Sequence, residues 1–207
     1  MRNFKIHCSQ IGKIMGASKP IGGLSVTCKS FLHEWYADEM EEIHSKYTDK
    51  GNQVEPELIN FMAEILELGL AEKNEQIFED DYFIGTPDVV ASDFVVDVKA
   101  PFNKKTFNEK CILFDEDYKS QGQGYMHLTG KSRFIIFYGL MDTPEEANYG
   151  REVIYSDMLD SARWVGYEFK LDEAFIESVV EKVKLCRDYL SKYDTLVKSK
   201  LGKIHPN

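Results

Sequence analysis

The sequence lacks the features that place a chain in several common classes of protein. Its 207 residues include four cysteines, which lie far apart and form no CxxC pair. This spacing argues against a zinc ribbon and against a disulfide framework, so we expect the protein to work in a reducing cytoplasm. No apolar run approaches the ~20 residues of a membrane span, and we expect no signal peptide.

Several catalytic motifs are also missing. Gly122-Gln123-Gly124 lacks the third glycine and the preceding strand of a dinucleotide-binding fingerprint. His33-Glu34 lacks the second histidine of a zincin helix, because residue 37 is Ala. Neither a GxSxG elbow nor a GxxxxGK[ST] loop occurs, which argues against a serine hydrolase and a P-loop protein. The histidines are scattered, and we interpret each as a core or surface residue.

The charge of the chain is acidic but unevenly distributed. Acidic residues outnumber basic ones by 35 to 25, which gives a net charge of −10. Residues 1–33 contain five basic and no acidic residues, and residues 99–110 contain four lysines and one glutamate. A basic contact surface beside a carboxylate-rich centre suits a nucleic-acid partner, although chance clustering on a solvated surface explains the same pattern.

The apolar content of 43% predicts a folded core, and the spacing of apolar residues changes from helical to strand-like after Gly69. The pattern predicts helices over 9–15, 27–43, 48–69, 118–128 and 171–197, and strands over 76–78, 82–91, 94–99, 133–139, 152–155 and 164–170. No repeat or linker divides the chain. We therefore expect an α/β fold in a single domain over 1–207, with a mixed central β-sheet flanked by helices. Its core would cover about 9–140, and C-terminal strands and a long closing helix would cover 150–197.

One constellation of residues has the character of a catalytic site. Asp97 and Lys99 share one face of their strand, while Val96 and Val98 point to the core. The preceding turn brings Asp88 next to Asp97. Two adjacent carboxylates repel each other, and a divalent cation such as Mg²⁺ relieves that repulsion. Lys99 would then orient a metal-bound water for attack on phosphorus. The alternative is a surface salt bridge on a hairpin, because DxK triplets are common.

Four ordered segments carry a resemblance to a known family. They are residues 8–14 (CSQIGKI), 50–55 (KGNQVE), 86–88 (TPD) with 97–102 (DVKAPF), and 118–123 (YKSQGQ). Together they resemble the serine-bearing helix, the G-x-x-x-E helix, the S-P-D and E-x-K-x-P-F segments and the Q-x-Q helix of the lambda-type phage alkaline exonucleases. This family is a branch of the PD-(D/E)XK nucleases. The chain departs from it in having Thr86 for Ser and Asp97 for Glu.

The resemblance implies a fold with a restriction-endonuclease-like core. It also implies that the protein is a metal-dependent deoxyribonuclease, which hydrolyses double-stranded DNA from 5′ ends in phage recombination. Mg²⁺, for which Mn²⁺ would substitute, would be held by Asp88, Asp97, the Val98 carbonyl and Glu55. Lys99 would assist the nucleophilic water, and Gln121 would position that water or the scissile phosphate.

The resemblance also implies a binding site for a terminal 5′-phosphate and further partners. Ser9, Thr86 and Arg2 would bind the phosphate, and Ser9 is expected to cap the helix over 9–15. A homo-oligomeric ring around DNA and a single-strand annealing protein are implied as partners. If the protein is phage-encoded, its location would be the cytoplasm of a bacterial host.

Two alternatives to an exonuclease stay open at the level of sequence. A structure-specific or site-specific endonuclease on the same scaffold has the same catalytic residues. A catalytically inactive module that binds DNA or mimics it belongs to a different class. The joint presence of Asp88, Asp97 and Lys99 argues against the inactive module, because an inactive scaffold does not need all three.

Overall fold

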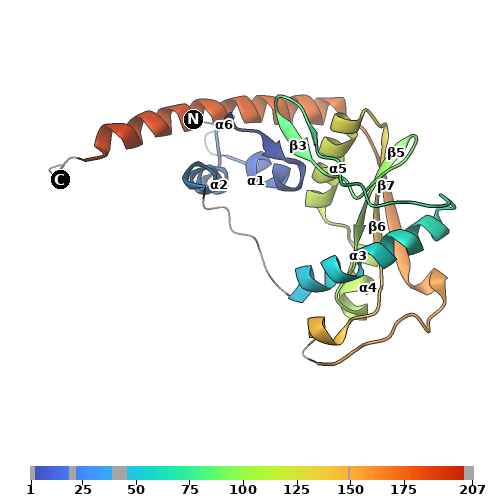
Figure 1. Cartoon of the computed structure of the whole chain (residues 1–207). Helices are drawn as coiled ribbons and strands as arrows, with labels where there is room; N and C mark the ends of the chain where they lie inside the picture. Colours follow the sequence, from blue (N-terminus) through green and yellow to red (C-terminus); the bar gives the residue numbers. More distant parts are fainter. Residues whose placement is uncertain (1–2, 19–21, 39–45, 149, 203–207) are drawn as a thin grey trace.

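Four strands form the central sheet, in the order β4-β5-β6-β7 (Figure 1). The computed structural model describes residues 3–18, 22–38, 46–148 and 150–202. The strands are β4 (Val89–Val90), β5 (Phe94–Lys99), β6 (Arg133–Gly139) and β7 (Trp164–Lys170). β5 and β6 are parallel, whereas the two outer pairs are antiparallel. The expected mixed sheet is confirmed, and the bounds of β5, β6 and β7 match the predicted strands.

A second, smaller sheet has the order β1-β3-β2. It contains β1 (Ile6–His7), β2 (Phe78–Glu79) and β3 (Phe83–Gly85). The prediction of one continuous strand over 82–91 was wrong, because β3 and β4 belong to different sheets. Pro87 lies between them, and a proline cannot donate a backbone hydrogen bond to a neighbouring strand. The break leaves residues 86–88 as a loop, which contains Asp88.

Helices cover both faces of the central sheet. The α-helices are α1 (Ile11–Met15), α2 (Val26–Ala37), α3 (Lys46–Ile65), α4 (Lys104–Ile112), α5 (Glu116–Thr129) and α6 (Glu173–Lys200). Short 3₁₀ helices are η1 (Cys8–Gln10), η2 (Glu145–Asn148) and η3 (Asp160–Ala162). No helix in the described part of the chain combines the length and apolar character that a membrane crossing requires.

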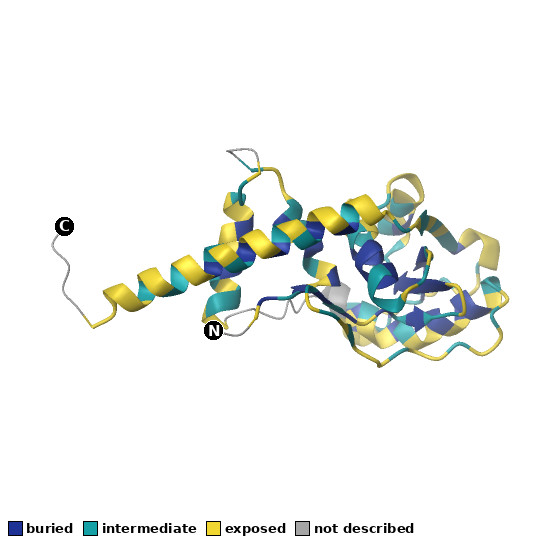
Figure 2. Ribbon diagram, turned by 90° about the horizontal axis from the view of Figure 1, so that it is seen from above, coloured by how far each residue is buried: buried dark blue, intermediate teal, exposed yellow. Residues whose placement is uncertain are grey.

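The two faces of the sheet are buried in separate hydrophobic clusters. Val95 and Ile136 pack in the cluster that contains residues of α1, α2, α5 and α6. Val96, Val98 and Phe137 pack in the cluster that contains residues of α3. α6 runs along one side of the molecule, exposes a continuous side, and extends beyond the sheet (Figures 1 and 2).

Several predicted helix and strand bounds were wrong for identifiable reasons. α2 ends at Ala37, where Asp38 adopts the left-handed conformation with φ 60°, and residues 39–43 of the predicted helix lie outside the described residues. Ser9 caps no helix, because it lies inside η1. The predicted strand over 152–155 is reduced to one bridge between Thr143 and Val153. α4 was not predicted.

Pro56 lies inside α3. A proline in that place removes one intrahelical hydrogen bond. The part of α3 before Pro56 is stabilised by Lys50, whose buried ammonium donates to three backbone carbonyls. These belong to Pro101, Phe102 and Met141, at 3.1, 3.0 and 2.7 Å. Tertiary hydrogen bonds therefore extend α3 across the proline.

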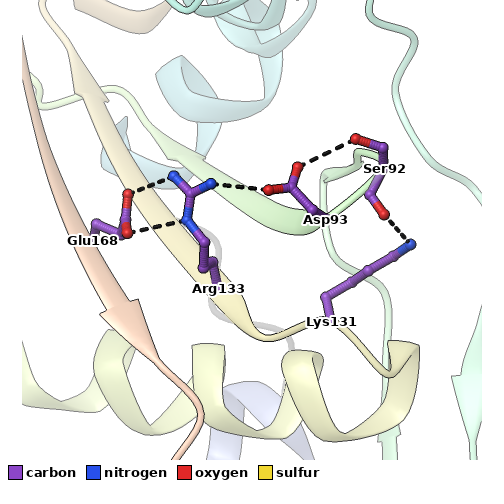
Figure 3. A network of polar contacts seen from close by, with 5 residues as sticks. All are labelled: Ser92, Asp93, Lys131, Arg133 and Glu168. Atoms are coloured by element: carbon purple, nitrogen blue, oxygen red, sulfur yellow. Dashed lines mark hydrogen bonds and ion pairs between the residues drawn. The ribbon is translucent and has the colours of Figure 1, made fainter.

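A polar network ties together the strand ends farthest from Lys99 (Figure 3). Arg133 of β6 donates to Glu168 of β7 through Nε and Nη2, at 3.0 and 2.7 Å, and to Asp93 through Nη1 at 2.9 Å. Lys131 Nζ donates to the carbonyl of Ser92 at 2.9 Å. An exposed ion pair contributes little stability, but a two-pronged arginine contact is geometrically specific. The network therefore joins β6 to β7 and to the turn before β5.

Glycines let α5 approach the sheet and η1 closely. A Cβ on Gly122 would lie 2.0 Å from Cδ1 of the fully buried Phe134. A Cβ on Gly124 would lie 2.7 Å from the sulfur of Cys8. Both glycines lie inside α5, where glycine otherwise weakens a helix. Their benefit is the close approach that places Gln121 against β5.

We predict that Gly122→Ala destabilises the fold by about 1–3 kcal/mol, because the added methyl overlaps a ring that cannot move away. Urea unfolding followed by circular dichroism measures this change. Gly51→Ala in α3 is the matched control, since a Cβ there has no neighbour within 4 Å. The control should be neutral or more stable, by up to about 1 kcal/mol. A Gly122→Ala variant as stable as the wild type would show that α5 is not held tightly against the sheet.

Candidate active site

The end of β5 provides the platform of the site. Asp97 lies on the face that packs against α5, where its side chain is 2% exposed. Lys99, two residues later, lies on the same face, and Val96 and Val98 pack on the opposite face. The predicted arrangement of this strand is therefore confirmed. The chemical roles assigned to these residues stay predictions.

The buried Asp97 carboxylate has two partners with different chemistry. Its Oδ1 accepts a hydrogen bond from Gln121 Nε2 at 3.0 Å. Its Oδ2 lies 2.5 Å from Lys99 Nζ in an ion pair. In the described residues no further group donates a hydrogen bond to this oxygen. One oxygen is therefore fixed by an amide, while the other faces a cation and keeps unused acceptor capacity.

Gln121 connects Asp97 to a buried phenol. Its Nε2 also donates to Tyr125 Oη at 2.8 Å, one helical turn further along α5. Burial, together with the charge of Asp97, raises the pKa of Tyr125, so the phenol stays neutral and serves as an acceptor. The two hydrogens of the amide are thus used by Asp97 and Tyr125. The amide oxygen of Gln121 remains as an acceptor for a further ligand.

Asp88 lies in the loop between β3 and β4, beside the end of β5. Its Oδ2 accepts a hydrogen bond from the Val98 N–H at 2.7 Å. In an extended strand the N–H and C=O of one residue point to the same side, so the Val98 carbonyl also faces Asp88. The loop is held from outside by Asn74, whose N–H donates to the Asp88 carbonyl at 2.7 Å and whose side chain donates to the Pro87 carbonyl at 2.9 Å.

Glu55 reaches the same region from α3. Its Oε2 accepts a hydrogen bond from Lys73 Nζ, which forms an ion pair with it. Lys73 lies in the segment after α3, next to Asn74 in sequence. The third carboxylate that the sequence predicts for the site is therefore present, with a lysine bound to it.

A cavity of about 520 Å³ lies beside these residues, and Asp88 and Asp97 are not part of its lining. Its lining includes the proposed catalytic residues Glu55, Val98, Lys99 and Gln121, the α4 residues Thr106 and Lys110, and Ser9. The volume lies within the roughly 300–1,000 Å³ that is usual for small-molecule sites. The lysine-rich stretch of residues 99–110 thus contributes to one wall of the cavity.

The electrostatics of the site reflect an excess of negative charge. Burial and the neighbouring Asp97 carboxylate raise the pKa of Asp88 to about 7. Burial alone would lower the pKa of Lys99, but Asp97 and Asp88 outweigh it and raise that pKa above its ordinary value. Lys99 is therefore a permanent cation, which excludes it as a general base in this state.

The donors present suit a Mg²⁺ site with few protein ligands and several waters. They do not form a site in which the protein alone supplies every ligand. Among the described residues no three His, Cys, Asp or Glu side chains already converge on one point. The donors available are the Asp88 and Asp97 carboxylates, the Val98 carbonyl, and Glu55 if Lys73 releases it. Mg²⁺ usually binds through one or two carboxylates and keeps several waters. The unused capacity of Asp97 Oδ2 and the raised pKa of Asp88 both favour such a cation.

A second, smaller cavity of about 260 Å³ adjoins the first, because Ser9 lines both. It brings together Ser9 and Thr86, which are exposed, with His7 and Tyr125. The structure thus joins two of the three residues predicted to bind a terminal phosphate. The third, Arg2, lies outside the described residues.

Some residues at the site were missed by sequence reasoning. Lys73 and Asn74 lie in a charged segment without periodicity, which reads as a solvated loop. Tyr118 was seen only as part of a motif, although Lys99 Nζ lies 5.1 Å from the centre of its ring. Tyr125 carries a usable signal, because it lies one helical turn after Gln121 and on the same face of the helix.

Solved structures of known proteins share this architecture. A phage-related exonuclease from Haemophilus somnus 129PT is 24% identical, with a TM-score of 0.79, over 96% of this chain and 97% of that chain. The alkaline exonuclease LHK-Exo from Laribacter hongkongensis is 17% identical, with a TM-score of 0.70, over 95% of this chain and 92% of that chain. A structure of LHK-Exo in complex with dAMP gives a TM-score of 0.69.

The chain has the fold of the alkaline exonucleases. The resemblance found in the sequence is confirmed at this level, and so is the expected α/β architecture. No protein-family model matches the sequence, and no curated protein matches it either. The likeness extends over nearly the whole length of each of these exonucleases.

We predict that Asp88→Asn stabilises the chain in the presence of a chelator, and more so as the pH rises. A carboxyl whose folded pKa is raised loses stability as the pH rises from its ordinary value of 3.8 to about 7. Asn keeps an acceptor for the Val98 N–H but carries no charge. The gain should reach about 1–3 kcal/mol at pH 8.5 and be smaller at pH 4.

The measurement is urea unfolding of both proteins across this pH range, compared as a difference so that other groups cancel. Asp157→Asn, a change at an exposed carboxyl, is the control and should show no such trend. A difference that stays constant with pH would mean that Asp88 is not destabilised by its surroundings.

Proposed function

We propose that this protein is a nuclease, and specifically a metal-dependent exodeoxyribonuclease of the lambda-type family that hydrolyses double-stranded DNA from its 5′ ends. One observation carries the proposal. Asp88, Asp97, Lys99 and Gln121 meet where β5 ends, in a fold shared with exonucleases, beside a cavity that Lys99 and Gln121 line. The dAMP complex of LHK-Exo supports a cavity suited to a nucleotide.

Each side chain has a distinct task in this mechanism. Asp88, Asp97, the Val98 carbonyl and Glu55 would hold the Mg²⁺. The ion, when bound, stabilises the charge on the attacking and leaving oxygens. Lys99, which stays protonated, attracts the phosphate and orients the attacking water. The free amide oxygen of Gln121 accepts a hydrogen bond from that water. Mn²⁺ would replace Mg²⁺, because both ions accept oxygen ligands.

Recognition of the DNA end is assigned to the smaller cavity. Ser9 and Thr86 would donate their hydroxyls to a terminal 5′-phosphate, and Arg2 would add a charge. Since Ser9 lines both cavities, a nucleotide whose phosphate is held there would extend toward Glu55, Lys99 and Gln121, which line the larger one. A ring-shaped homo-oligomer and a single-strand annealing protein are the partners that the family resemblance implies.

The decisive experiment is digestion of an end-labelled linear duplex. We expect degradation with Mg²⁺ or Mn²⁺ and none in excess chelator, because the carboxylates alone cannot stabilise the developing charge. Lys99→Ala should lower the single-turnover rate by about 10²–10⁴-fold, the usual effect of losing a positioned catalytic group.

Closed circular DNA of the same sequence is the control substrate and should stay intact. Its cleavage at a similar rate would favour the endonuclease alternative. Undiminished digestion in chelator would rule out the metal mechanism, and no digestion under any condition would favour an inactive DNA-binding module. Thermal unfolding of Lys99→Ala confirms that a lost rate does not reflect a lost fold.

A further prediction tests the phosphate site. Linear duplex with a 5′-phosphate should be degraded about 10-fold or more faster than its 5′-hydroxyl counterpart, since a charge-assisted hydrogen bond contributes roughly 1.5–3 kcal/mol. Thr86→Val, Ser9→Ala and Arg2→Ala should each shrink this preference without abolishing metal-dependent cleavage. Ser178→Ala, at an exposed serine of α6 that lines neither cavity, is the control. Equal rates on both ends would remove the phosphate site from the proposal.

A further inference from the structure

We propose that Lys73 is a resident cation that holds Glu55 in the metal-free protein and must release it when a divalent cation binds. Lys73 is then a positioning residue that sets how much metal the site requires. This inference rests on the proposed function, because it assigns Glu55 to the metal. No segment of the family resemblance includes Lys73.

The contact itself places Lys73 at the site. Its ammonium donates to Glu55 Oε2, on a carboxylate that is 20% exposed and lines the larger cavity. The Lys73 side chain is 49% exposed. Because the ammonium is already partly exposed, it can move into solvent at little cost, whereas Glu55 would stay at the cavity wall.

Asn74 explains why the lysine is held there. Its backbone N–H and its side chain donate to the carbonyls of Asp88 and Pro87, at 2.7 and 2.9 Å. Its Oδ1 also accepts from the Gln76 N–H at 3.2 Å. The segment that carries Lys73 is thus fastened to the loop that carries Asp88. An ordinary surface lysine on a free loop would not have this constraint.

The two lysines of the site differ in how they can respond to a cation. Lys99 lies 2.5 Å from the buried Asp97 and is 29% exposed, so it is enclosed by the fold. Lys73 is more exposed and contacts the carboxylate at the rim. An incoming ion therefore displaces Lys73 at the lower cost. The site would change from three carboxylates that face two lysines to three carboxylates that bind a metal ion beside Lys99.

Competition of this kind weakens the apparent affinity for the ion. When a ligand binds only the form with Glu55 released, its apparent dissociation constant rises by the reciprocal of the population of that form. An exposed ion pair has a modest stability, so the effect of removing Lys73 should be about three- to tenfold.

The test is isothermal titration of the full chain with Mn²⁺ alone, without DNA. Lys73→Met should bind Mn²⁺ about three- to tenfold more tightly than the wild type. Lys5→Met is the matched control, because Lys5 forms an ion pair of 3.0 Å with Glu79 on the small sheet. That control should leave Mn²⁺ binding unchanged. Thermal unfolding of each variant verifies that it is folded.

A double mutant separates a specific role from a general charge effect. In a Glu55→Gln background, adding Lys73→Met should no longer tighten binding, since the pair is already broken. The same gain in that background would overturn the inference, and so would binding by Lys73→Met that equals or falls below that of the wild type. If the wild type binds no Mn²⁺, the proposed function fails as well, whereas binding without a gain in Lys73→Met overturns this inference alone.

Discussion

The burial of the Asp97 carboxylate is the constraint on which the rest of the site depends. An ionised carboxylate in a protein interior is costly unless hydrogen bonds and opposite charge compensate it. Here one oxygen is satisfied by Gln121 and the other faces Lys99. These partners come from α5 and from β5 itself. The charge of Asp97 therefore requires both that α5 lies close to the sheet and that β5 contains Lys99.

This link explains features of the sequence that have no other structural use. A glutamine inside a helix reaches a strand only if the helix lies close to the sheet. Gly122 and Gly124 permit that approach, because any Cβ at either position would overlap Phe134 or Cys8. The loss of helix stability at two glycines is offset by the burial of α5 against the sheet. The Q-x-Q segment, its glycines and the DxK strand therefore form one structural unit.

Features that depend on local sequence patterns could be predicted, whereas features that depend on contacts between distant segments could not. β5, β6 and β7 were predicted to the residue, because their period-2 or continuous apolar pattern is a local property. The start of α3 was predicted to within two residues, and Lys50 stabilises this part of the helix by donating to carbonyls of distant segments. The split of β3 from β4 at Pro87 depends on which sheet each half joins. Asp88, Asp97, Lys99 and Gln121 were found by motif, whereas Lys73 and Asn74 have no local pattern and become visible only in three dimensions.

The balance of charge at the site connects stability with function. A pure cluster of three carboxylates would destabilise the fold in the absence of metal, since like charges repel in a region of low dielectric. The chain instead supplies two ammonium groups. Lys99 forms an ion pair with the buried Asp97, and Lys73 lies at the rim in a segment that Asn74 holds in place. The negative charge of the folded state is therefore partly compensated before any ion arrives, and the carboxylates keep their positions. Because Lys73 is more exposed than Lys99, the same arrangement that stabilises the metal-free protein would, under the proposed function, also determine where a divalent cation enters.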